Sequence, residues 1–221
     1  MGRFLDSSLG RKFIMALTGL LLTGFLVMHL LGNLSLFAGK DGEAFITYAE
    51  KLHDLGPLLV VSELALLALF AIHVGMAVRL TILNREARPV RYQVKRTFGE
   101  STPSSASMFV TGSIVLGFLV VHLATMRFAD GLSALRGEKL HGQVVSVLEN
   151  PILALIYLAG SIAVGVHLAH GFRSLFQSLG ANHGRINRGA RALGWGLAIL
   201  FAIGFAAFPL AGLFGFWRGE G

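Results

Sequence analysis

The sequence predicts an all-α integral membrane protein with five transmembrane helices in one domain, residues 1–221. Its composition is the first indication, because 54% of the 221 residues are hydrophobic and only 14% are charged. The mean hydropathy of +0.67 also lies above that of ordinary soluble domains. The second indication is the presence of five apolar stretches, each of which reaches the ~20 residues that cross a bilayer.

The five stretches are expected to form helices over residues 13–37, 57–83, 107–128, 151–175 and 192–216. The first is too long for the apolar part of a signal peptide and has no small-residue cleavage site after it, so it is expected to remain as a membrane helix. The connections of about 15 to 23 residues leave no room for a second folded domain.

The basic residues predict the orientation, because loops held in the cytoplasm carry excess Lys and Arg. The N-terminus and the second and fourth connections with their flanks hold 13 of the 19 basic residues. This distribution predicts a cytoplasmic N-terminus and an external C-terminus. The net charge of +7 is therefore a topology signal, and no nucleic-acid partner is expected. The densest basic cluster suits either lipid phosphate or an acidic partner subunit and comprises Arg85, Arg88, Arg91, Lys95 and Arg96.

Four of the five stretches each carry one histidine between apolar neighbours, namely His29, His73, His122 and His167. At ~1.5 Å per helical residue, His29 and His122 lie about 9 to 12 Å from the outer surface. His73 and His167 lie about 12 to 15 Å from the inner surface. An unpaired imidazole in hydrocarbon is costly, so the equal depths predict an outer pair, His29 with His122, and an inner pair, His73 with His167.

Two histidine pairs can ligate two b-type haems stacked across the membrane. The chain has no cysteine, so each haem is expected to be held by coordination alone. Metal ions other than haem iron would usually recruit carboxylates or cysteines as well. Close approach of a flat macrocycle also suits the glycines of these stretches, although small residues equally drive helix packing in membranes. These glycines include Gly19, Gly24, Gly112, Gly117, Gly160 and Gly165.

Two further residues follow His167 closely. His170 projects from nearly the same helical face as His167 and is expected to support the haem site rather than ligate iron. Arg173 could reach the propionates of the inner haem or a docked subunit, or it could be an ordinary interfacial arginine. The remaining histidines, His53, His141 and His183, fall in connections. The fifth stretch carries no histidine and is expected to cover the bundle.

Glu63 is the only acidic residue well inside a predicted span. Carboxylates within a membrane are expensive enough that a function is the default expectation. Glu63 lies near the depth of His29 and His122, so we hypothesise that it transfers the proton that accompanies quinone chemistry beside the outer haem. A purely structural carboxyl, hydrogen-bonded between helices, is the alternative.

Several strings resemble the five-helix, two-haem cytochrome b subunit of succinate dehydrogenases and fumarate reductases. They are "GRKFIMALTGLLLTGFLVMHLLGNLSLFAG", "FITYAEKLHDLGPLL", "SELALLALFAIHVGMAVRL" and "HLAHGFRSLFQSLG". The resemblance covers most of the chain and implies the same four ligands, His29, His73, His122 and His167. In some fumarate reductases of this type a glutamate stands two residues before the fourth ligand and moves protons, and here that position is Gly165.

The resemblance further implies a membrane anchor in the cytoplasmic membrane of a bacterium. Its partners would be a flavoprotein subunit with FAD and an iron–sulfur subunit, both on the cytoplasmic face, and the dicarboxylate site would lie on those subunits. The anchor would pass electrons between the iron–sulfur clusters and membrane quinone, with menaquinone implied by the two-haem type.

Two other classes remain open from the residues alone. The cytochrome b subunit of a hydrogenase or formate dehydrogenase would share the histidine pairing. A haem-free transporter would require broken helices and often an inverted repeat. The histidines are 44, 49 and 45 residues apart, which fits a repeat and equally fits one span plus one loop.

Overall fold

The computed structural model describes residues 7–39, 41–86, 103–178 and 184–217, and helices dominate these ranges. The five long helices are α2 (Ser8–Asn33), α4 (Pro57–Glu86), α5 (Pro103–His122), α7 (Pro151–Ser178) and α8 (Gly184–Leu213). A short 3₁₀ turn, η1 (Leu34–Phe37), extends α2, and a π-helical turn, η2 (Leu123–Arg127), extends α5. Two shorter helices, α3 (Glu43–His53) and α6 (Gly137–Glu149), complete the order.

The five predicted spans are confirmed as helices that are long and apolar enough to cross a membrane. Their bounds differ most at the two ends of the chain. α2 begins at Ser8, where the Ser7 hydroxyl accepts a hydrogen bond from the Gly10 amide, and not at residue 13. α8 runs from Gly184 to Leu213, whereas the prediction was 192–216. Hydropathy marks only the membrane-buried part of a helix, so the polar extensions were missed.

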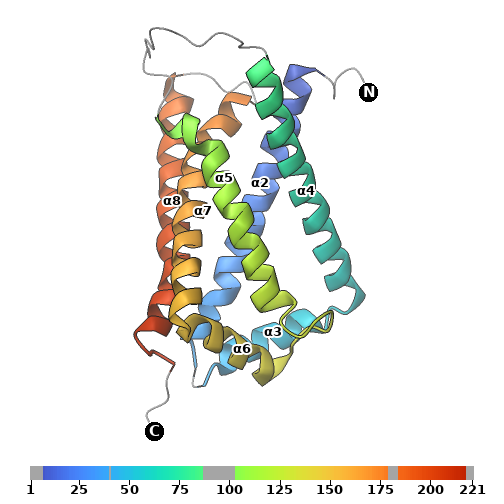
Figure 1. Ribbon diagram of the computed structural model, residues 1–221, viewed down its shortest axis with the longest axis vertical. Helices are drawn as coiled ribbons and strands as arrows, with labels where there is room; N and C mark the ends of the chain where they lie inside the picture. Colours follow the sequence, from blue (N-terminus) through green and yellow to red (C-terminus); the bar gives the residue numbers. More distant parts are fainter. Residues whose placement is uncertain (1–6, 40, 87–102, 179–183, 218–221) are drawn as a thin grey trace.

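The helices α3 and α6 were not expected, because the sequence analysis treated both outer connections as loops. Both lie across the lower end of the bundle, roughly perpendicular to the spanning helices (Figure 1). Each leads directly into a long helix that begins with proline, α4 at Pro57 and α7 at Pro151. The Asn150 side chain accepts hydrogen bonds from the amides of Ile152 and Leu153 and so caps α7.

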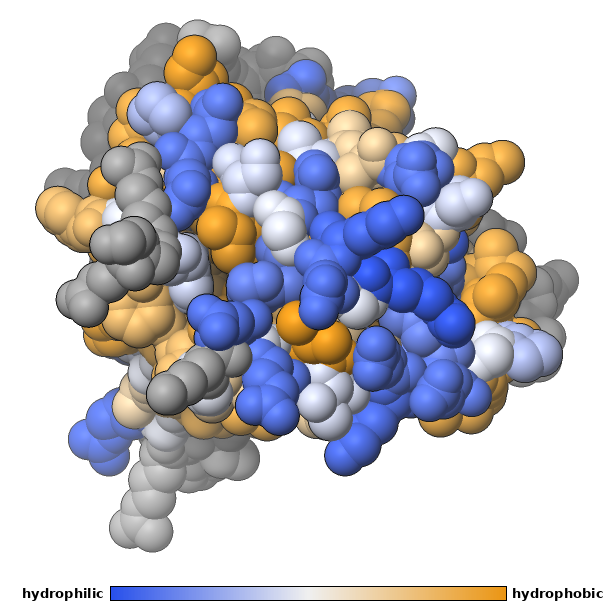
Figure 2. All heavy atoms as spheres, turned by 90° about the horizontal axis from the view of Figure 1, so that it is seen from below, coloured by the Kyte–Doolittle hydropathy of each residue, from blue (hydrophilic) through white to orange (hydrophobic). Residues whose placement is uncertain are grey.

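The two ends of the bundle carry different sets of charged residues. α2 and α8 begin and α4 ends at the upper end in Figure 1, which therefore carries Arg11, Lys12, Arg85, Arg188 and Arg191. The lower face, seen in Figure 2, is largely hydrophilic and carries the acidic residues of α3 and α6 together with several basic ones. The segments that the charge distribution assigns to one side of the membrane therefore share one end of the bundle.

The tightest helix pair is α7 with α8, which lie side by side along most of their length (Figure 1). Small residues allow this approach, as is usual between membrane helices. A Cβ atom on Gly165 would lie 2.7 Å from the Ala202 Cβ and 2.8 Å from the Ala198 carbonyl oxygen. Gly165 is therefore a packing position against α8, and a glutamate side chain would not fit there without moving α8.

The second of the five long helices, α4, packs mainly along α2, and none of its residues is buried. The best-packed core lies instead towards the lower end, where α2, α3, α6, α7 and α8 meet around Leu30, Leu148, Tyr157, Phe201 and Phe208. The helices that carry the four histidines thus differ in how closely the protein itself surrounds them.

Replacing Gly165 with alanine is expected to destabilise the protein by about 1–3 kcal/mol, because the added methyl group overpacks the α7–α8 contact. Equilibrium unfolding of the purified protein in detergent measures the change. Gly196→Ala in α8 is the control, since a Cβ there meets nothing within 4 Å and should be neutral or slightly stabilising. Equal stability of the two variants would contradict the assigned role of Gly165.

Candidate functional site

The four span histidines come from four different helices, and the outer pair meets directly. His29 projects from α2 and His122 is the last residue of α5. Their ring centroids are 5.8 Å apart and their planes are perpendicular. The Nδ1 atom of His122 is buried and has no hydrogen-bond partner among the described residues. The structure thus brings together the two residues that the sequence analysis paired by depth.

Aromatic side chains surround the outer pair. Phe25 stacks on His29 at 5.3 Å, and Phe205 of α8 approaches the same ring at 6.0 Å. On the other side, Phe118 and Tyr157 each lie 5.8 Å from the ring of His122. The expectation that the fifth long helix only covers the bundle is therefore incomplete, because α8 supplies one wall of this apolar site.

The inner pair is held in a different way, by hydroxyl groups on neighbouring helices. His73 of α4 lies with its Nδ1 atom 3.0 Å from the Thr18 hydroxyl oxygen of α2. A Cβ on the adjacent Gly19 would lie 3.3 Å from the His73 Cε1 atom, so the glycine is what allows the ring to approach α2. The imidazole therefore rests on a Thr-Gly step of the facing helix.

His167 of α7 rests on a second Thr-Gly step, in α5. Its Nδ1 atom lies 3.3 Å from the Thr111 hydroxyl oxygen, and a Cβ on Gly112 would lie 3.3 Å from its Cε1 atom. The two inner imidazoles are close enough to each other for an electrostatic interaction. In both residues Nδ1 is engaged, which leaves Nε2 as the nitrogen available to a ligand.

The sequence analysis missed Thr18 and Thr111, although a signal for them was present. Residues 18–30 read TGLLLTGFLVMHL and residues 111–123 read TGSIVLGFLVVHL. Each segment begins with the Thr-Gly step and ends with an outer histidine, His29 or His122, followed by leucine. Pro57 and Pro151 likewise each precede an inner histidine by 16 residues. The chain therefore contains an internal repeat, α2 to α4 and α5 to α7, which the histidine intervals alone did not establish.

Of the two side chains expected to support the inner site, the structure describes that of His170 but not that of Arg173. His170 lies in α7 one turn beyond His167, with which it interacts electrostatically. Its Nδ1 atom is buried and unpaired among the described residues, so this nitrogen is available for a further hydrogen bond. Arg173 also belongs to α7, but its side chain falls outside the described part of the chain. Its suggested contact with a propionate stays a prediction.

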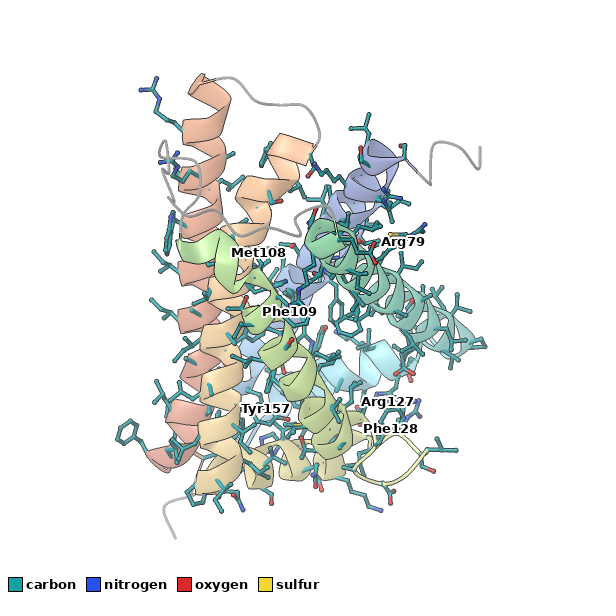
Figure 3. All side chains as sticks on the ribbon, turned by 45° about the horizontal axis from the view of Figure 1, so that its top comes forward. Arg79, Met108, Phe109, Arg127, Phe128 and Tyr157 are labelled. Atoms are coloured by element: carbon teal, nitrogen blue, oxygen red, sulfur yellow. The ribbon has the colours of Figure 1, made fainter. Side chains whose placement is uncertain are left out.

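Glu63 has a partner that the sequence analysis did not anticipate. Arg127, the last residue of the π-helical turn η2, donates from Nε to Glu63 Oε1 at 2.8 Å and from Nη2 to Oε2 at 3.0 Å. Its guanidinium also lies over the Phe128 ring at 5.3 Å, at the lower end of the molecule in Figure 3. The pair joins α4 to the end of α5 and is about one-third exposed.

The donor set suits haem better than a bare metal ion. No cluster of three or more His, Cys, Asp or Glu side chains that could hold a metal ion occurs among the described residues. Each site instead offers two imidazoles from separate helices. Paired imidazoles are a common way to hold haem iron, and hydrogen bonds at Nδ1, such as the contacts with Thr18 and Thr111, orient such ligands. The His122 Nδ1 is a buried polar group that has no hydrogen-bond partner in the described part of the chain, in an otherwise apolar setting.

Fold and site together define a polytopic helical membrane protein in which His29 and His122 meet directly and His73 and His167 rest on matching Thr-Gly steps. The family of succinate dehydrogenase/fumarate reductase transmembrane subunits matches residues 83–207, which is more than half of the chain. The chain therefore belongs to this family. No curated protein and no solved structure matches it.

The ion pair between Glu63 and Arg127 is expected to contribute about 1 kcal/mol of coupling free energy, because it is bidentate but partly exposed. A double-mutant cycle with Glu63→Gln and Arg127→Gln, read by unfolding in detergent, measures it. Glu86 at the opposite end of α4 provides the control, and Glu86→Gln should show no coupling to Arg127→Gln. A coupling energy near zero for the first cycle would mean that the pair does not tie α4 to α5.

Proposed function

We propose that this chain is the two-haem cytochrome b membrane anchor of a succinate:quinone oxidoreductase. It would transfer electrons between an iron–sulfur subunit and membrane quinone, and the dicarboxylate chemistry would occur on other subunits. The observations that carry the proposal are the direct contact between His29 and His122 and the placing of His73 and His167 on matching Thr-Gly steps of the same apolar bundle, in a chain of the succinate dehydrogenase/fumarate reductase family.

The residues of the chain have separate tasks in this proposal. Haem iron, when bound, supplies a one-electron carrier inside a medium that excludes ions. His29 and His122 would hold the iron of the outer haem, and His73 and His167 that of the inner haem. Phe25, Phe118, Phe205 and Tyr157 keep water away from the outer pair, and the Thr-Gly steps of α2 and α5 hold the inner pair. His170 and Arg173 would support the inner haem.

The partners follow from the family and from the charge distribution. We place the basic end of the bundle, where α2 begins, on the cytoplasmic side of a bacterial membrane. Electrons would pass at this end to or from an iron–sulfur subunit, which in turn serves a flavoprotein subunit with FAD. Lipid phosphate neutralises the remaining basic residues. The quinone is proposed to be menaquinone.

Haem quantification and absorption spectra of the purified complex, oxidised and then reduced with dithionite, test this function. We expect two low-spin b-type haems per chain. His122→Ala and His167→Ala should each lose one haem, whereas the matched control His53→Gln should keep both, because His53 lies in α3 outside the spans and its Nδ1 atom bonds the Ala49 carbonyl oxygen of the same helix. A colourless wild-type complex, or loss of both haems in the control, would overturn the proposal.

Glu63 is proposed to carry the proton that accompanies quinone chemistry at the outer level. Glu63→Gln should lower quinone-linked turnover about tenfold or more while both haems remain bound, since the amide cannot exchange a proton at neutral pH. Arg127→Gln breaks the same ion pair but keeps the carboxyl group, and should retain more of the turnover. Equal losses in the two variants, or loss of haem in Glu63→Gln, would instead assign Glu63 a structural role.

A further inference from the structure

We propose that Thr18 and Thr111 are positioning residues that fix the tautomer and tune the electronic character of the two inner histidines. Each hydroxyl accepts the Nδ1–H of an imidazole on the neighbouring helix, so that Nε2 is presented as an unprotonated ligand. Within the described ranges no hydroxyl group bonds the ring of either outer histidine, so these hydrogen bonds would make the two haem sites unequal. The inference rests on the proposed function, because it concerns how the inner histidines bind iron.

The direction of the hydrogen bond follows from the number of available protons. The Thr18 hydroxyl lies 2.8 Å from the Ile14 carbonyl oxygen and 3.0 Å from the His73 Nδ1. A carbonyl oxygen has no proton to supply, so the single hydroxyl proton must point towards Ile14. The contact with His73 therefore uses the proton on the ring. Nδ1 is the protonated nitrogen, and Nε2 keeps its lone pair for a metal.

The same reasoning applies to the second copy of the unit. The Thr111 hydroxyl donates to the Met108 carbonyl oxygen at 3.2 Å and lies 3.3 Å from the His167 Nδ1. Thr18 is 5% exposed and Thr111 is 8% exposed, so water cannot easily replace either bond. Two buried threonines, each at the same distance along the chain from an outer histidine, thus serve the two inner histidines.

The outer pair shows no comparable acceptor. The His122 Nδ1 is buried without a hydrogen-bond partner in the described ranges, and aromatic rings are the neighbours of both outer imidazoles. Donation from Nδ1–H makes an imidazole a more basic ligand, and a more basic ligand favours the oxidised iron. The threonines are therefore expected to lower the reduction potential at the inner site relative to the same site without them.

Redox titration of the purified complex with Thr18→Val and Thr111→Val tests this inference. Valine keeps the shape of threonine but removes the acceptor. Each variant should favour reduction of the inner haem by up to about tenfold, which is about 59 mV for a one-electron couple, and leave the outer haem unchanged. Thr18→Ser should restore the wild-type value. The inner haem is assigned as the one whose low-spin electron paramagnetic resonance signal disappears in His73→Ala.

Thr23→Val is the matched control, because Thr23 is buried on the same helix and its hydroxyl bonds the Gly19 carbonyl oxygen without an approach to histidine in the structure. Unchanged potentials in Thr18→Val and Thr111→Val with both haems present, or the same shift in Thr23→Val, would overturn the inference while leaving the proposed function intact. Absence of haem from the wild-type complex would overturn the proposed function itself. The spectra and the titration thus separate the two failures.

Discussion

The architecture of this chain depends on the requirement that an imidazole inside an apolar bundle must find a polar partner. Among the described residues the inner level meets this requirement, whereas the outer level leaves the His122 Nδ1 without a hydrogen-bond partner. At the inner level, His73 and His167 each meet a threonine hydroxyl across a helix–helix contact. At the outer level, His29 and His122 meet each other among aromatic rings. Which helices must be neighbours follows directly: α2 beside α4, α5 beside α7, and α2 facing α5.

Glycines at a few positions allow the helices to approach one another closely enough for these contacts. Gly19 and Gly112 admit the imidazoles of the inner level, and Gly165 admits α8. The tight α7–α8 contact contrasts with α4, which has no buried residue and is joined to the rest by α2 and by the bond between Glu63 and Arg127.

The internal repeat explains why each level of histidines is built from one residue of each copy. Corresponding residues of the two copies, His29 with His122 and His73 with His167, form each pair, and the two Thr-Gly steps stand at the same place in each copy. The short helices α3 and α6 also correspond, and they close the same end of the bundle (Figure 1). The residues repeated in both copies contact the histidines. Helix α8 has no counterpart in the repeat and adds an aromatic wall through Phe205.

The sequence by itself determined the number of spanning helices, their apolar segments, the grouping of charged connections and the histidines that meet at the outer level. Hydropathy and helical rise are local properties, and both can be read along the chain. Only the tertiary structure decided that α3 and α6 are helices, that Arg127 is the partner of Glu63, and that Thr18 and Thr111 hold the inner histidines. These three side-chain contacts join residues more than fifty positions apart, and their selection depends on how the helices are rotated about their axes. No pattern within one segment specifies that rotation.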